Sequence, residues 1–324
     1  MKLPINKSTY KFFFGFILIL LTFFYLDLKE ILNILNVNHF YVLIMVQPLQ
    51  VLSIYMLSRR FSILSGGIKN KEKNYFKAYL LSIGLNTFIP ARLSELIKIT
   101  YMKKKGNLST THYVSALILE RYLDIIFLII LIFLGILFSL VEFNQKILIF
   151  LIALIGIIFT LFFLNSFVLQ KILNLLKKFL DYKYYKITKN FFDLISKKIF
   201  KLNFLYSFLL SLVVWVISFL LVFIILKYLH GDLVDAYRAS IIFLSLTLSR
   251  IIPGLPANLG TFELAIIFSM SKLGFEINDA FLTAITIHLS QIIFPTLISL
   301  IIFTNEGLGI KSFLKSTKNF IKND

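Results

Sequence analysis

Runs of about 20 residues made almost entirely of Ile, Leu, Phe and Val recur along this sequence. At a helical rise of about 1.5 Å per residue, each run is long enough to cross the roughly 30 Å hydrocarbon core of a bilayer. Hydrophobic residues make up 58% of the 324 residues and charged residues 15%, a balance that the surface of a water-soluble domain does not tolerate. The sequence therefore predicts an all-α integral membrane protein.

The first apolar segment follows Lys2, Lys7 and Lys11 as the core of a signal peptide would, but no small-residue cleavage site comes after it. We therefore expect a retained helix. The chain has no cysteine, which excludes disulfides and thiolate metal sites. The predicted apolar segments are 12–26, 39–58, 78–102, 112–140, 147–167, 203–227, 236–272 and 279–303.

Two of these segments are interrupted near their middle. Proline removes a backbone donor and glycine frees the backbone, so each segment is expected to form two half-helices. A half of about 12 residues spans about 18 Å, which reaches the midplane of the bilayer and no further. The interrupting residues are Asn86 and Pro90 in segment 78–102, and Pro253, Pro256 and Gly260 in segment 236–272.

The positions of the basic residues indicate how the interrupted segments lie, because cytoplasmic loops are enriched in Lys and Arg. Both flanks of segment 78–102 are basic, whereas the flanks of segment 236–272 show no basic excess. We expect two oppositely oriented re-entrant hairpins and about six transmembrane helices in one multi-pass domain over residues 1–324 of a plasma membrane protein, with both termini cytoplasmic. The basic residues beside the first hairpin are Arg59, Arg60, Lys69, Lys71, Lys73 and Lys77 before it and Lys98, Lys103, Lys104 and Lys105 after it.

The formal net charge of +18 suggests acidic partners, and segment 170–202 indicates which kind. Apolar residues alternate there with lysines, a pattern typical of amphipathic helices that lie on the cytoplasmic leaflet. We therefore expect anionic membrane lipids as partners and no nucleic acid. A second copy of the chain and a separate lipid-modifying enzyme are further candidate partners. No nucleotide, metal or nucleophile motif occurs, so we predict no cofactor, no metal and no catalytic residue.

Several charged residues fall inside the predicted membrane region, where each charge costs a few kcal/mol unless it is paired or functional. Glu120 and Asp124 share one helical face and need a cation, which Arg92 or Arg121 could supply. These charges either bind substrate or neutralise one another to hold the helices together. His112, His288 and Gln291 are interpreted as helix-packing residues. The candidate substrate-binding residues are Arg92, Glu95, Glu120, Arg121, Asp124, Arg250 and Glu263.

The two interruptions resemble each other in sequence. PARLSEL at the first is echoed by PANLGTFEL at the second, and an acidic residue follows each proline by about a turn. This pattern favours an inverted repeat, in which broken helices form a midplane site for an anionic group. Two similar tight turns are the simpler alternative. Arg92 and Arg250 lie beside the interruptions and are candidate phosphate ligands.

Three motifs in order, NTFIPARLSELIKITYMKKKG, ILERYLD and IIPGLPANLGTFELA, make the chain similar to a known family. It resembles the flippase-like transmembrane domain of lysylphosphatidylglycerol synthases over nearly its whole length. The resemblance implies lipid handling, and it places Asn86, Pro90, Arg92, Glu95, Glu120, Arg121, Asp124, Pro256, Gly260 and Glu263 on the family's patterned positions. The sequence ends at Asp324, so we expect a stand-alone member without the aminoacyl transferase domain.

The leading hypothesis is a lipid translocase that moves a phospholipid or lipid-linked head group between leaflets. One alternative is an intramembrane enzyme that acts on a lipid-linked substrate, such as a glycosyltransferase using one of the acids as a base. The other is a membrane scaffold in which the charges only pack helices.

Overall fold

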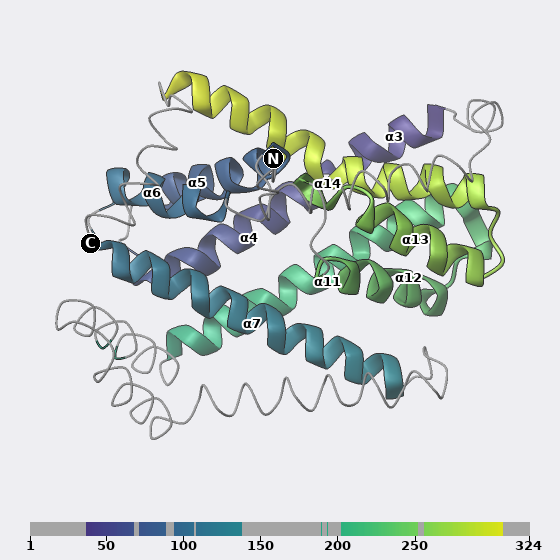
Figure 1. The fold of residues 1–324 in the computed structure, drawn as a ribbon, viewed down its shortest axis with the longest axis horizontal. Coiled ribbons are helices and arrows are strands. Elements are labelled where there is room, and N and C mark those ends of the chain that lie inside the picture. Colours follow the sequence, from purple (N-terminus) through teal and green to yellow (C-terminus); the bar gives the residue numbers. More distant parts are fainter. Residues whose placement is uncertain are drawn as a thin grey trace, which may run out of the picture. The chain divides into compact units, whose positions relative to one another are not determined.

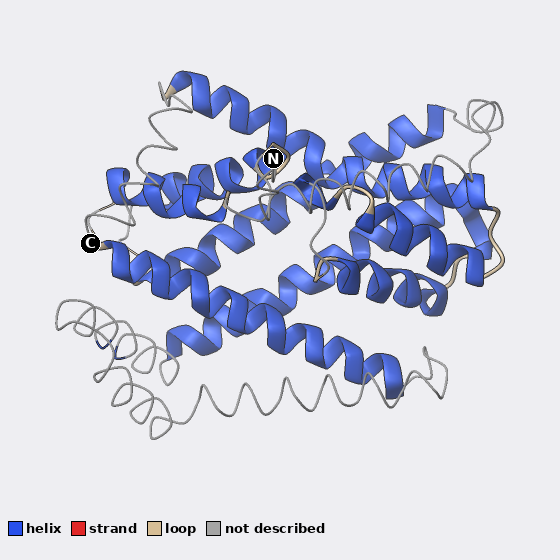
Figure 2. Ribbon diagram, viewed as in Figure 1, coloured by secondary structure: helices blue, strands red, loops and turns tan. Residues whose placement is uncertain are grey.

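All regular structure in the described residues is helical, and these residues contain no strand (Figure 2). The computed structural model describes residues 37–67, 71–88, 94–106, 108–137, 202–251 and 256–306, together with positions 189 and 193. Outside the described residues lie the predicted helices at 12–26 and 147–167, most of segment 170–202, and the residues Pro90, Arg92 and Pro253.

The helices follow the chain in the order labelled in Figure 1. They are α3 (Val37–Met45), α4 (Gln47–Ser65), α5 (Glu72–Leu85), α6 (Glu95–Lys105), α7 (Thr110–Leu137), α11 (Leu202–His230), α12 (Ala236–Ser249), α13 (Thr261–Lys272) and α14 (Ile277–Asn305), with the 3₁₀ turns η1 (Gly231–Leu233) and η2 (Pro256–Asn258).

In the part of the chain that the structure describes, 3 helical stretches are long and apolar enough to cross a membrane, namely Val37–Ser65, Leu202–Leu233 and Ile277–Asn305. Along α11 the large apolar side chains of Leu205, Leu209 and Leu212 remain exposed. They recur every three or four residues and so form one face of the helix, as expected for a helix whose face contacts lipid.

Both predicted interruptions are present. The first lies between the end of α5 at Leu85 and the start of α6 at Glu95. The second separates α12, which ends at Ser249, from α13, which begins at Thr261 after the short turn η2. The prediction that each of the two segments forms a pair of shorter helices is therefore confirmed by where these helices end and begin.

The chain divides into two compact units, and α4, α5, α6 and α11 each contribute residues to both. The described residues of the first unit fall within Met1–Ile54, Tyr79–Lys98 and Ile217–Asp324, and those of the second within Tyr55–Ala78 and Ile99–Val216.

In the first unit, α13 packs against both α12 and α14, and α3 packs against α14 (Figure 1). The end of α5 also approaches α14 closely at Gly84. A Cβ atom at Gly84 would lie 2.2 Å from Ser299 Oγ and 2.3 Å from the carbonyl oxygen of Pro295. Only a glycine allows this approach, since real side-chain carbons do not come so near to other atoms.

Pro295 lies inside α14, and its missing N–H leaves the carbonyl of Gln291 without the usual helical partner. The side chain of Gln50 on α4 satisfies that carbonyl, with Nε2 donating over 3.2 Å. One turn earlier on α4, Gln47 Nε2 donates to the carbonyl of Ser290 over 3.2 Å. In an apolar environment an unsatisfied carbonyl is costly, so the hydrogen bond from Gln50 makes the proline tolerable, and Gln47 adds a second contact to α14 beside it.

Candidate functional site

The two helix interruptions meet in the first unit. The backbone N–H of Ala257, in the second interruption, donates to the carbonyl oxygen of Asn86 at the end of α5, over 3.1 Å. The side chain of Asn86 also holds the two sides of its own interruption together, because Ser94 Oγ donates to Asn86 Oδ1 over 3.0 Å. We call Asn86, Ser94 and Ala257 the break junction. It joins the ends of α5 and η2 to the start of α6.

The backbone of the second interruption adopts an uncommon conformation. Ala257 and Asn258 have positive φ angles of 59° and 62°, and Gly260 has a φ of 84°. Glycine adopts such angles freely and asparagine tolerates them, but alanine in this region costs about 1–2 kcal/mol. Strain of this kind persists where the surroundings fix the residue. For Ala257 they do so through both its N–H and its carbonyl.

The carbonyl of Ala257 accepts a hydrogen bond from His288 of α14, with Nε2 at 3.0 Å. The other ring nitrogen, Nδ1, lies 2.5 Å from Oε1 of Glu263. The remaining carboxylate oxygen of Glu263, Oε2, accepts from the N–H of Gly260 over 2.7 Å and caps α13. Both side chains are buried, His288 at 3% and Glu263 at 8% exposure. A connected set of hydrogen bonds therefore runs from Ser94 to Glu263.

Each of the two second half-helices has an acidic residue in its first turn. Glu95 is the first residue of α6, and Glu263 is the third residue of α13. A carboxylate in the first turn is favourable, because the N-terminal end of a helix carries a partial positive charge. The parallel between PARLSEL and PANLGTFEL thus corresponds to an acid in the first turn of each helix, at positions that differ by two residues.

Arg250 follows the last residue of α12 and is half-buried. Its Nη2 donates to Oε1 of Gln291 on α14 over 2.8 Å. Gln291 is neutral, so this contact orients the guanidinium through a hydrogen bond and not through an ion pair. The planar guanidinium is the side-chain group best suited to bind a phosphate.

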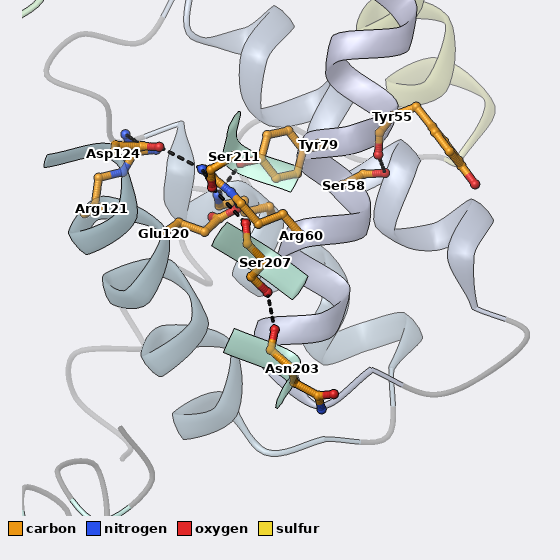
Figure 3. Close-up of polar contacts among 11 residues, drawn as sticks. Tyr55, Ser58, Arg60, Tyr79, Glu120, Arg121, Asp124, Asn203, Ser207 and Ser211 are labelled. Carbon is orange, nitrogen blue, oxygen red and sulfur yellow. Dashed lines mark hydrogen bonds and ion pairs between the residues drawn. The ribbon is translucent and has the colours of Figure 1, made fainter. Parts of the chain in front are cut away.

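The second unit contains a separate group of charges, drawn in Figure 3. Arg60 of α4 lies between two acids of α7, with Nη1 2.8 Å from Asp124 Oδ1 and Nε 3.6 Å from Glu120 Oε1. Arg60 Nη1 also donates to Ser211 Oγ on α11 over 3.0 Å. Arg121 Nη1 pairs with the other oxygen of Asp124 over 2.9 Å. We call Arg60, Glu120, Arg121 and Asp124 the charge cluster.

The charge cluster holds two arginines and two acids, so the four charges sum to zero when all four residues are ionised. Arg60 is 1% exposed and Glu120 is fully buried. Arg60 is too buried for a phosphate group to reach it in this arrangement, whereas Arg121 is 38% exposed. Both the binding and the structural interpretation of Glu120, Arg121 and Asp124 therefore remain open.

The structure places the predicted site residues in two groups. Asn86, Gly260, Glu263 and the backbone of Pro256 lie at or beside the break junction, with Arg250 and Glu95 in the same unit. Glu120, Arg121 and Asp124 lie in the second unit.

Two functional candidates are not singled out by the sequence. In the sequence, Arg60 is one of several basic residues that flank the first predicted hairpin. In the structure, it is the cation between Glu120 and Asp124. His288, interpreted above as a packing residue, is the partner of Glu263. The sequence contained one indication of this role, because a histidine buried within an apolar helix needs a hydrogen-bond partner.

Membrane-length apolar helices, helix interruptions joined by a backbone hydrogen bond, and buried charges define an integral membrane protein. Residues 10–299 match the family model of the lysylphosphatidylglycerol synthase TM region, and the chain belongs to this family. No curated protein and no solved structure matches the chain. Family membership gives the protein a role connected with membrane lipids.

Proposed function

We propose that the protein is a lipid translocase, in which the head group of a phospholipid or lipid-linked molecule passes beside the break junction. The observation that carries this proposal is the hydrogen bond from Ala257 N to Asn86 O. Non-helical backbone at membrane depth is tolerated only where protein buries it or where it lines a watery cavity. Transporters commonly place their substrate sites between such interrupted helices.

The proposal includes a finer architecture. Segments 78–102 and 236–272 are re-entrant hairpins from opposite leaflets and form an inverted repeat within one plasma membrane domain, with about six crossings and both termini cytoplasmic. Support comes from the presence of Glu95 and Glu263 in the first turns of α6 and α13 and from the basic flanks of the first hairpin.

Arg250 and Arg92 are the proposed phosphate ligands. Arg250 is supported by its position directly after α12 and by the contact that orients it toward Gln291. Arg92 is supported by the sequence alone. Glu263 is less suited to bind a head group directly, because His288 and Gly260 already engage both of its oxygens. Glu95, the other predicted site acid of this unit, is the proposed partner of a cationic head group.

The test is lipid translocation in liposomes reconstituted with the purified full-length chain and fluorescent phospholipids. Arg250→Gln should lower the initial rate about tenfold, because a hydrogen bond to a charged group contributes about 1.5–3 kcal/mol. Arg238→Gln is the matched control, since Arg238 lies on the same helix, at its other end, and binds the carbonyl of Leu233. Equal rates for the two variants, or no movement of any phospholipid, would contradict the proposal.

One observation favours a second function, an intramembrane enzyme acting on a lipid-linked substrate. A buried carboxylate in contact with an imidazole is typical of acid–base sites, and Glu263 with His288 has this geometry. The enzyme interpretation expects the purified protein to consume a sugar nucleotide or a polyprenyl-linked donor. Translocation without any such turnover would eliminate it.

A further inference from the structure

We propose that Glu263 and His288 together bind one proton, and that release of this proton breaks one of the two hydrogen bonds by which His288 connects α14 to Ala257 and Glu263. The site lies where α13, α14 and the loop around Ala257 meet. The inference rests on hydrogen-bond geometry and does not depend on lipid translocation.

The two contacts of His288 fix the number of protons. A carbonyl oxygen can only accept, so Nε2 must carry a hydrogen to bind Ala257 O at 3.0 Å. In a neutral ring Nδ1 would then be an acceptor, and an ionised carboxylate is also only an acceptor. These two atoms lie 2.5 Å apart, so a proton must lie between them. The count is the same whether the proton is closer to the ring or to the acid.

The pair is enclosed by an aromatic ring and a backbone N–H group. The ring of Phe262 stacks on the imidazole, with centroids 4.2 Å apart and an angle of 16° between planes. Glu263 Oε2 accepts from Gly260 N, a contact that both the ionised and the protonated acid can make. With the shared proton the pair is neutral overall, whereas without it a net negative charge is buried, which is unfavourable.

Loss of the proton leaves one hydrogen for two acceptors. If it stays on Nε2, then Nδ1 and Glu263 Oε1 face each other as acceptors and must separate. If it moves to Nδ1, then Nε2 can no longer donate to Ala257, and that link is lost. Ala257 is held in its left-handed conformation by this link and by its N–H bond to Asn86. In either case His288 loses one of its two hydrogen bonds, so proton release weakens the connection between α14 and the residues around the second interruption.

Other charged and titratable groups belong to the same unit. Arg250 binds Gln291, which lies about one turn along α14 from His288. The helix α11 also contacts α14, through the hydrogen bond of His230 to Thr283. The titratable and charged groups on the described helices of this unit are Tyr237, Arg238 and Arg250 on α12 and its end, Lys272 on α13, Glu276 and Asp279 at the start of α14, His39 and Tyr41 on α3, Tyr79, Glu95 and Lys98 on α5 and α6, and Lys227, Tyr228 and His230 on α11.

Glu263→Gln imitates the protonated acid. Its amide nitrogen can donate to Nδ1 while its oxygen accepts from Gly260 N, so both contacts survive without a titrating proton. The folded wild type holds a proton that the separated side chains release as pH rises, so its stability should fall with rising pH relative to Glu263→Gln.

The experiment measures equilibrium unfolding of the full-length chain in mixed micelles of mild detergent and SDS, from about pH 6 to about pH 9. The unfolding constant of the wild type, divided by that of Glu263→Gln, should rise by up to about tenfold per pH unit. His230→Gln is the control and should show the same rise against Glu263→Gln as the wild type, since His230 bonds Thr283 and not an acid. A ratio that does not change with pH, or a Glu263→Gln chain that does not fold, would overturn the proposal. Neither readout involves lipid movement, so the outcome is independent of the proposed function.

Discussion

Arg60→Met is expected to lower the free energy of unfolding by about 3–5 kcal/mol. The arginine is 1% exposed and lies between Glu120, which is fully buried, and Asp124. Methionine fills a similar volume but leaves the Glu120 carboxylate buried without its cation. Removal of one partner of a buried ion pair is far more costly than absence of the pair. Equilibrium unfolding in mixed detergent micelles measures the change.

The preceding residue supplies a matched control. Arg59 pairs with Glu72, but both side chains are substantially exposed, at 34% and 50%. Arg59→Met should therefore cost less than about 1 kcal/mol. The double variant Arg60→Met with Glu120→Gln should recover part of the loss, because the unpaired charge is then gone. Equal effects of the two arginine variants would show that burial of Arg60 does not matter for stability.

Gly84→Ala is expected to destabilise the protein by about 2–3 kcal/mol, although glycine in a helix is usually inferior to alanine by about 1 kcal/mol. In this structure the substitution is expected to lower stability and not to raise it. The new Cβ would lie 2.2 Å from Ser299 Oγ and 2.3 Å from the carbonyl of Pro295, so α5 and α14 must separate. The same unfolding assay in mixed micelles measures whether the substitution lowers or raises stability. A neutral or stabilising result would contradict the close approach of α5 to α14 at Gly84.

A second substitution tests which neighbour is responsible. Ser299→Ala removes the hydroxyl but leaves the carbonyl of Pro295 in place, since that atom belongs to the backbone. The double variant with Gly84→Ala should therefore regain only part of the stability. Full recovery would mean that the side chain of Ser299, and not the α14 backbone, limits the approach.

The helix interruptions could be predicted because their cause is local. Proline and glycine change the backbone wherever they stand, so Pro256 and Gly260 mark the start of α13 without reference to the rest of the fold. The acidic first turns of α6 and α13 could be predicted for the same reason, as Glu95 and Glu263 each follow the proline of their interruption by one to two helical turns. The proline and glycine residues within each segment were thus sufficient to predict where the half-helices lie.

The partners of the charged residues could not be predicted, because pairing depends on packing between distant segments. Arg60 and Glu120 are 60 positions apart in the numbering, and Glu263 and His288 are separated by 25. No periodic pattern connects such residues. The positive-inside rule placed Arg60 with the cytoplasmic flank, since the rule counts charges and does not consider burial. Arg92 lies outside the described residues, so its role stays a prediction.

The break junction is the central feature of this account, and a cross-link beside it tests that feature most directly. Thr87 Oγ1 and Thr296 Oγ1 lie 2.9 Å apart, next to Asn86, and the chain has no cysteine of its own. In a Thr87→Cys, Thr296→Cys variant the two sulfurs should form a disulfide that fixes the end of α5 to α14.

Lipid translocation by this double-cysteine variant, measured in liposomes before and after reduction, is the decisive comparison. Each single-cysteine variant serves as the control for oxidation. We predict that the oxidised double variant translocates at least about tenfold more slowly than the reduced one, because a head group can pass beside the break junction only if the end of α5 moves relative to α14. Efficient disulfide formation with an unchanged rate would contradict the claim that lipid passes beside the break junction.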